Sequence, residues 1–195
     1  MLTNLVSYIN ELFNNRKVRK TLLKLRLPLG LVLFALLLPH VRPAWFFPGL
    51  IVSILGEGLQ VWCFATIKTH RKLTVTGPYQ FVRNPMYIGR FFLIFGILMM
   101  TGSLLLLIVF TAIYWFYMTN RVGREEKLLT ELFGDDYRGY QKAVRPYLPS
   151  FNQWRPDLLW SFDRENFFRN NAHINIAAVA IVYVIIFYFT FLRQA

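Results

Sequence analysis

Arg83-Asn84-Pro85-Met86-Tyr87-Ile88-Gly89 is the stretch that decides the fold, because it leads directly into an almost wholly apolar run that extends to Asn120. Asn84 before Pro85 predicts the start of a helix, since an Asn side chain can cap free backbone N–H groups and a proline ring presets the first helical φ angle. Polar, turn-forming and aromatic residues therefore meet an apolar segment here. The stretch is either the cap of a membrane helix or part of a functional site.

The composition indicates an integral membrane protein. Of the 195 residues, 55% are hydrophobic and 17% aromatic, and the mean hydropathy is +0.39, which is too apolar for a soluble domain of this size. The formal charge of +12 could suggest nucleic acid. However, the Lys and Arg residues cluster at the ends of apolar runs, so we interpret them as topology and headgroup charges and expect no nucleic-acid partner.

The pattern predicts an all-α fold that forms a single membrane domain, residues 1–195, with about five transmembrane helices. Residues 1–20 read as an interfacial helix that ends in a basic cluster. The predicted spans are residues 22–38, 44–67, 86–101, 103–120 and 172–192. The third and fourth spans would form a short hairpin, each about 25 Å long.

Residues 121–160 read as a polar region before the last span. An amphipathic helix is expected from Arg121, broken at Gly134, and a last helix is expected to begin at Asp163 and continue into the final span. With an odd number of spans, almost all basic loops fall on one side. The N-terminus and both polar segments are therefore predicted to be cytoplasmic.

Two polar segments, Leu73–Arg90 and Arg121–Pro149, would emerge on that side and could converge on one site. They supply cations, anions and aromatic walls that suit a zwitterionic ligand with a planar ring. These residues are Arg83, Arg90, Arg121, Glu125, Glu126, Tyr79 and Tyr87. The alternative for the helix is a solvated face formed by Arg124, Glu126 and Glu131, with border arginines reaching lipid phosphates.

Metal and dinucleotide chemistry find no support in the sequence. The single cysteine, Cys63, lies in an apolar span, and the three histidines are scattered without metal-ligand spacing, so no metal is predicted.

Glu57 and Gln60 share a face of the second span. A carboxyl group at that depth is costly, so Glu57 either lines a site or is a buried, protonated, hydrogen-bonded group.

Four stretches occur in order between residues 70 and 149. They are Gly77-Pro78-Tyr79, the stretch from Arg83 to Gly89, Arg124-Glu125-Glu126, and Phe133-Gly134-Asp135-Asp136-Tyr137-Arg138-Gly139-Tyr140. In this order and spacing they resemble the signature of the isoprenylcysteine carboxyl methyltransferase family. These are membrane-embedded methyltransferases in a superfamily that includes phospholipid N-methyltransferases.

The resemblance implies S-adenosylmethionine as cofactor, S-adenosylhomocysteine as product, and residues 121–160 as a region that covers the cofactor. By position, the implied cofactor contacts are Leu73, Thr74, Tyr79, Asn84, Pro85, Met86, Tyr87 and Glu125. Arg121 would face the substrate carboxylate, and no general base is expected because a carboxylate is already ionised at neutral pH. Asn84 stands where the family often has His, and an amide can still donate and accept hydrogen bonds.

The activity that the resemblance implies is methyl transfer to the carboxylate of a lipid-modified, isoprenylated cysteine that enters from the bilayer. Three alternatives stay open at this point: a phospholipid amine N-methyltransferase in which Glu57 takes the proton, an NADPH-dependent membrane reductase, and a non-enzymatic scaffold.

Overall fold

The computed structural model describes residues 15–68, 72–151 and 154–193. Helices, turns and irregular segments make up these described ranges, which confirms the all-α fold class. The α-helices are α2 (Arg16–Leu37), α3 (Pro43–Thr66), α4 (Pro85–Met99), α5 (Leu104–Ala143), α6 (Arg164–Arg169) and α7 (Ala172–Phe187). Short helical turns are η1 (Leu38–His40), η2 (Gly77–Gln80), η3 (Pro156–Leu158) and η4 (Tyr188–Leu192), the last with π-type hydrogen bonding.

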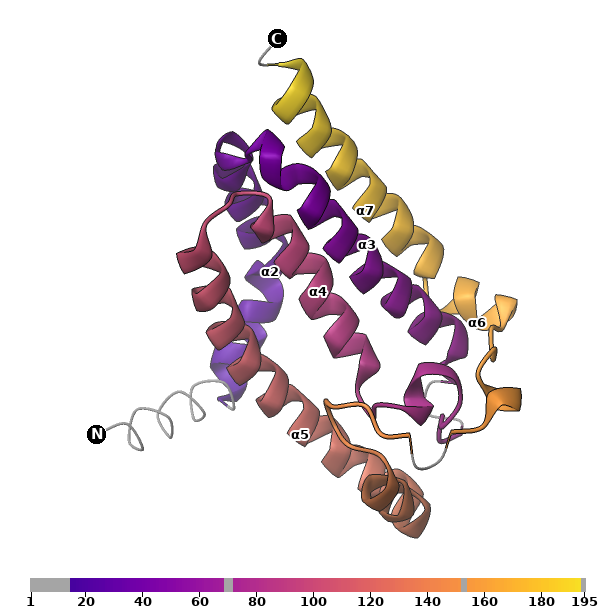
Figure 1. Cartoon of the computed structure of the whole chain (residues 1–195). Helices are drawn as coiled ribbons and strands as arrows, with labels where there is room; N and C mark the ends of the chain where they lie inside the picture. The colour runs from indigo at the N-terminus through magenta and orange to yellow at the C-terminus, as the bar shows by residue number, and fades with distance from the viewer. Residues whose placement is uncertain (1–14, 69–71, 152–153, 194–195) are drawn as a thin grey trace.

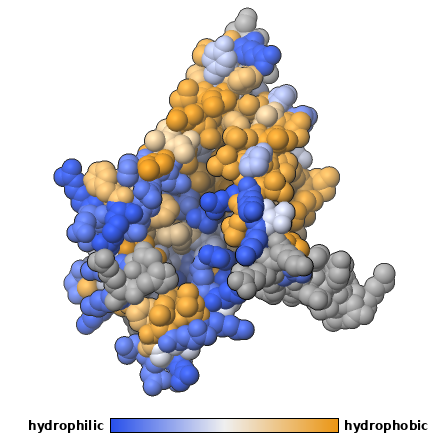
Figure 2. Space-filling view, turned by 180° about the vertical axis from the view of Figure 1, so that it is seen from behind, coloured by the Kyte–Doolittle hydropathy of each residue, from blue (hydrophilic) through white to orange (hydrophobic). Residues whose placement is uncertain are grey.

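Helices α5, α4, α3 and α7 lie in that order across the molecule, and α2 lies behind them (Figure 1). The lower end in this view carries η2, the second half of α5 and the segment between α5 and α6. We refer to it as the polar end. Seen from behind, the upper part of the surface is largely hydrophobic, whereas hydrophilic residues gather toward the polar end (Figure 2).

Four described stretches are long and apolar enough to cross a membrane. They are Leu23–His40, Pro43–Thr66, Leu104–Ala143 and Ala172–Leu192. A shorter apolar helix, Pro85–Met99, is about 22 Å long at 1.5 Å per residue. Many large apolar side chains on these helices are exposed, including Leu55 and Val184, as expected for surfaces that face lipid.

Close backbone packing joins α3 to α4. A Cβ atom added at Gly56 would lie 2.4 Å from the Leu93 nitrogen, and one added at Gly96 would lie 2.5 Å from the Gly49 carbonyl oxygen. Ser53 also donates a hydrogen bond from Oγ to the Leu93 carbonyl at 2.9 Å. Small residues permit this approach, which membrane helices use in place of a hydrophobic driving force. The α3–α4 pair is therefore a firm support for the start of α4.

Three boundaries differ from the sequence expectation. Helix α2 begins at Arg16, so part of the basic cluster belongs to it, while residues 1–14 of the expected interfacial helix lie outside the described residues. Helix α5 does not end at residue 120 but continues to a kink at Gly134, where φ is 54° and ψ is −123°. The kink is where the sequence predicts a break, because only glycine adopts this conformation readily.

The expected continuous last helix is interrupted, and this prediction was wrong. Helix α6 ends at Arg169, and Asn171 adopts a left-handed conformation with φ of 59° before α7 begins. Asn170 explains the interruption, because its amide donates to the carbonyls of Phe64 (2.8 Å) and Ile67 (3.2 Å) at the end of α3. These carbonyls would otherwise be unpaired at the helix end.

Candidate functional site

The site is built where α4 begins, at the polar end. Pro85 occupies the first helical position and is buried, as the sequence predicts for a helix start. The Asn84 side chain, however, does not cap the helix. Its amide donates instead to Glu126 Oε1 (3.3 Å) and to the Pro146 carbonyl (3.5 Å), so Asn84 connects α4 to α5 and to the segment that follows α5.

The centre of the site is a cluster of three side chains, Tyr87, Arg121 and Glu125. The Tyr87 hydroxyl donates to Glu125 Oε1 at 2.8 Å and accepts from Arg121 Nε at 3.2 Å. An ion pair of 2.9 Å joins Arg121 Nη2 to the same carboxylate oxygen. The side chains of Arg121 and Glu125 are 45% and 36% exposed, whereas Tyr87 is buried. Both charged groups are therefore accessible to a ligand while a buried hydroxyl holds them together.

Tyr114 fixes Tyr87 from the membrane side, and the sequence analysis did not identify it. Its hydroxyl donates to the Tyr87 carbonyl at 2.7 Å, and both rings pack with Met118 and Val122 of α5. Tyr114, Met118 and Arg121 recur at helical spacing, so the shared face was present in the sequence as a signal. Arg90 lies over the Tyr87 ring, 6.0 Å from its centroid.

Glu126 belongs to a second, more buried network. It pairs with Arg83 at 3.2 Å, and the two side chains are 18% and 10% exposed. Gln141 donates from Nε2 to Glu126 Oε2 (3.4 Å), and its carbonyl accepts from Arg83 Nη1 (3.1 Å). Glu126 is thus not part of a solvated face, contrary to that alternative, whereas Glu131 is exposed. The network fastens the start of α4 to α5 on both sides of its kink.

Tyr79 connects η2 to the end of α5. Its carbonyl accepts from the Tyr140 hydroxyl at 2.7 Å, and its ring is buried beside Cys63. Burial raises the pKa of the Tyr79 hydroxyl well above its ordinary value, and the neighbouring Cys63 and Tyr140 add to the shift. Tyr79 therefore stays a neutral phenol.

The remaining predicted contact residues differ in their surroundings. Leu73 packs against Tyr137, Tyr140 and Val144. Thr74 accepts from the Lys68 backbone N–H at 3.1 Å. Met86 is half-buried in the first turn of α4. The structure thus brings Asn84, Tyr87, Arg121 and Glu125 together. It places Leu73 and Tyr79 against Tyr140 at the end of α5, and Thr74 beside Lys68.

Glu57 is separate from this site. It accepts from Asn175 Nδ2 on α7 at 2.8 and 3.0 Å through its two carboxyl oxygens, and from Gln60 Nε2 at 3.3 Å. Of the two alternatives, the structure matches a hydrogen-bonded group that joins α3 to α7. Within the described ranges, His, Cys, Asp and Glu form no group of three or more that could hold a metal ion.

An accessible carboxylate beside an accessible guanidinium fits a ligand that carries an ammonium and a carboxylate. Fold and site therefore define an integral membrane protein with an accessible pair of opposite charges where its helices leave the apolar layer. A family model described as phospholipid methyltransferase matches residues 48–136, which include α4 and the first half of α5.

Curated relatives agree with this class. A probable protein-S-isoprenylcysteine O-methyltransferase of Oryza sativa subsp. indica is 30% identical over 129 residues, covering 59% of this chain and 68% of the relative. The Schizosaccharomyces pombe protein-S-isoprenylcysteine O-methyltransferase is 34% identical over 77 residues, 40% of this chain and 33% of the relative. Methanethiol S-methyltransferase 1 of Bradyrhizobium diazoefficiens is 38% identical over 77 residues, 40% and 25% of the two chains. The chain belongs to the isoprenylcysteine carboxyl methyltransferase family.

Proposed function

We propose that this protein transfers the methyl group of S-adenosylmethionine to the carboxylate of an isoprenylated cysteine, at a site on the cytoplasmic side of the membrane. The observation that carries the proposal is the Tyr87–Arg121–Glu125 cluster, in which opposite charges are accessible and share one buried hydroxyl. Family membership supports methyl transfer as the reaction. The basic residues gathered at the polar end support the cytoplasmic orientation.

Glu125 is the residue that would hold the cofactor. Its carboxylate is the accessible anion of the cluster and would face the ammonium of the methionine part. S-adenosylmethionine supplies a methyl group that is activated by a positively charged sulfur. The Arg83–Glu126 network holds Asn84 at the start of α4, and Tyr114 holds the Tyr87 carbonyl.

Arg121 is the residue that would hold the acceptor. A guanidinium stays protonated and presents two parallel donors, so it can fix a carboxylate without giving up a proton. Arg121 and Glu125 pair with each other in the structure. On ligand binding this ion pair would break, so that Arg121 would bind the acceptor carboxylate and Glu125 the cofactor ammonium. The Tyr87 hydroxyl contacts both side chains and can stay bonded to either during the exchange.

Carboxylate methylation requires no general base, because a carboxyl group of pKa about 4 is ionised at neutral pH. The chain's task is then to align the acceptor oxygen and to strip it of water. Alignment alone can lower a barrier by about 7–11 kcal/mol. The apolar layer of Tyr114, Met118 and Val122 beneath Tyr87 supports water exclusion on the membrane side.

A phospholipid amine is a poorer acceptor for this site. An amine must lose a proton, and Glu57, the carboxylate considered for that task, is hydrogen-bonded to Asn175 between α3 and α7. A cation such as Arg121 would also repel a protonated amine. These observations favour the carboxylate.

The test is methyl transfer from labelled S-adenosylmethionine by the purified, reconstituted protein. The acceptors to compare are N-acetyl-S-farnesylcysteine, phosphatidylethanolamine and methanethiol. We expect label in the farnesylcysteine product, released as methanol by mild base because a methyl ester hydrolyses whereas an N-methyl or S-methyl group does not. Base-stable label, or label in the amine lipid alone, would refute the proposal. Binding of NADPH in place of S-adenosylhomocysteine would indicate a reductase.

A further inference from the structure

A cavity of about 480 Å³ lies at the polar end beside the proposed active site. Residues from η2, the end of α5 and the segment around η3 form its walls. They are Val75, Gln80, Tyr140, Val144, Trp154, Arg155 and Leu158. Tyr87, Arg121 and Glu125 are not among them. The cavity therefore does not include the central cluster, although Tyr140 of its lining donates to the Tyr79 carbonyl.

Gln80 lines this cavity and carries a buried hydrogen-bond donor that is not used. The residue is 4% exposed, and its Oε1 accepts from the Arg155 backbone N–H at 2.9 Å. This bond fixes which way the amide points, and its Nε2 is buried without a hydrogen-bond partner in the described part of the chain. Buried donors in native proteins are nearly always paired. The Nε2 group of Gln80 is thus available to donate a hydrogen bond to an acceptor atom of a ligand.

Arg155 adds a cation to the same wall. Its side chain is exposed and takes part in no ion pair among the described residues. A guanidinium beside an amide donor is a suitable pair for a phosphate or carboxylate. Val75, Val144 and Leu158 add apolar side chains to the lining. An anion attached to an apolar body fits this lining.

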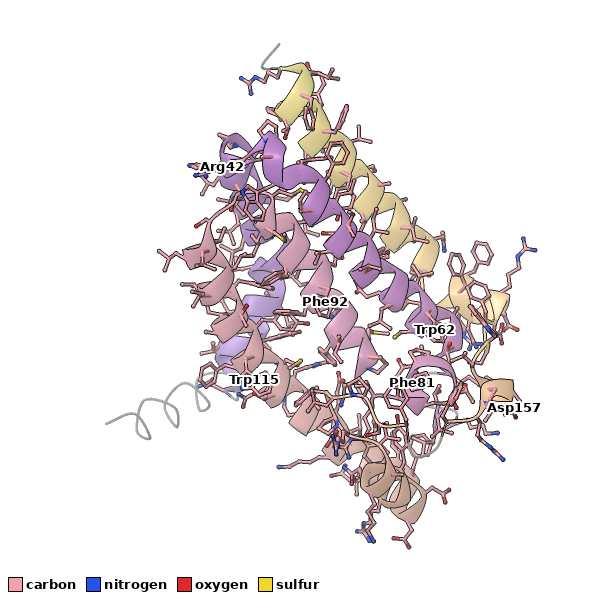
Figure 3. All side chains as sticks on the ribbon, in the orientation of Figure 1. Arg42, Trp62, Phe81, Phe92, Trp115 and Asp157 are labelled. Atoms are coloured by element: carbon pink, nitrogen blue, oxygen red, sulfur yellow. The ribbon has the colours of Figure 1, made fainter. Side chains whose placement is uncertain are left out.

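The surroundings of the cavity point to lipid. Trp154, Trp160 and Phe162 are 54%, 83% and 56% exposed, and aromatic side chains at this density mark a membrane–water interface. Trp160 also stacks on Trp62 of α3, with ring centroids 6.3 Å apart and planes at 27°. Figure 3 shows Asp157 of this segment next to the end of α3 that carries Trp62. The segment around η3 thus lies against the membrane-spanning part of the molecule.

We propose that this cavity binds the phosphate headgroup of an anionic phospholipid. Gln80 Nε2 and Arg155 hold the phosphate oxygens, and Trp154 and Leu158 line the path of the glycerol and the first acyl carbons. The two residues proposed to hold the phosphate, Gln80 and Arg155, are not among those proposed to hold the cofactor or the acceptor. An occupant would contact Tyr140 and η2, and so would stabilise the part of the chain that positions Tyr79.

Native mass spectrometry of the detergent-solubilised protein, titrated with phosphatidylglycerol or phosphatidylcholine, tests this site. Gln80→Glu keeps the acceptor for the Arg155 N–H but turns the donor into an anion, and Arg155→Gln removes an exposed cation. Each should lower the affinity for the first phosphatidylglycerol by about tenfold, the effect of losing one charged hydrogen bond. Arg164→Gln is the matched control, because Arg164 is exposed in the same region and does not line the cavity. It should bind as the wild type does.

Equal phosphatidylglycerol binding by wild type, Arg155→Gln and Gln80→Glu would overturn the proposal. So would equal affinity of the wild type for phosphatidylcholine. Titration with inorganic phosphate and with glycerol 3-phosphate separates the lipid from a soluble source, since either binding as tightly as phosphatidylglycerol would assign the cavity to a soluble anion. An acidic peptide that binds more tightly than phosphatidylglycerol would likewise overturn the lipid assignment. Arg155→Gln removes a surface charge and is expected to fold, so the test does not depend on Gln80 alone.

Discussion

Neutralising Glu126 should destabilise the protein, although neutralising its neighbour Glu125 should not. Glu126 is 18% exposed and pairs with an Arg83 side chain that is 10% exposed, and it also accepts from Asn84 and Gln141. In Glu126→Gln the single amide oxygen can accept from Asn84 or from Gln141 but not from both, and the guanidinium loses its counter-charge. Breaking a fully buried ion pair costs about 3–5 kcal/mol, so for this partly exposed pair we expect about 2–4 kcal/mol.

The single cysteine provides the assay. Cys63 is fully buried, so a thiol-reactive dye should label it only after unfolding, and the labelling midpoint in detergent gives Tm. For a chain of this size 1 kcal/mol shifts Tm by about 2–4 °C, which predicts a decrease of about 5–15 °C for Glu126→Gln. Glu131→Gln, an exposed position on the same helix, should stay within about 1 °C. A Tm of Glu126→Gln equal to that of Glu131→Gln would refute the structural role of the Arg83–Glu126 pair.

Three further outcomes follow from the packing and hydrogen bonds. Gly56→Ala should lower Tm strongly, because its Cβ would lie 2.4 Å from the Leu93 nitrogen, while Gly58→Ala on the same helix has open space and should be neutral or stabilising. Tyr140→Phe removes the 2.7 Å hydrogen bond to the Tyr79 carbonyl. It should lower the free energy of unfolding by about 1 kcal/mol in the dye assay and weaken S-adenosylhomocysteine binding. Wild-type cofactor affinity in this variant would show that Tyr79 is not part of the site. Asn175→Ala should lower the free energy of unfolding by about 0.5–1.5 kcal/mol without changing methyl transfer. Loss of activity in a folded variant would indicate that Glu57 belongs to the site.

The sequence predicted the helical class and the start of α4 for local reasons. Apolar runs bounded by proline or polar residues marked the helices, so the expected span 44–67 differs by one residue at each end from α3 (Pro43–Thr66). The break at Gly134 was also a local signal. The position of Asn84-Pro85 at the start of α4 needed no tertiary information.

What the sequence could not provide depends on long-range contacts. The bond from Tyr114 to the Tyr87 carbonyl joins residues 27 apart in the chain, and the Asn170 contact with Phe64 joins residues 106 apart. No local pattern separates Glu125, which is accessible, from Glu126, which is largely buried, because adjacent residues on a helix differ only in what packs against them. The continuity of α5 beyond residue 120 was missed because its residues change there from apolar to charged without any residue that breaks a helix.

The central claim is that Glu125 serves the cofactor and Arg121 serves the acceptor carboxylate. One paired measurement tests it: calorimetric affinity for S-adenosylhomocysteine and methyl transfer to N-acetyl-S-farnesylcysteine, in Glu125→Gln and in Arg121→Ala. Glu125→Gln should weaken cofactor binding by about 1–3 kcal/mol. Arg121→Ala should bind the cofactor almost as the wild type does but lose most transfer, and Arg121→Lys should recover only part, because an ammonium keeps the charge and loses the two-pronged geometry. Unchanged cofactor affinity in folded Glu125→Gln, or undiminished transfer in Arg121→Ala, would contradict this division of roles.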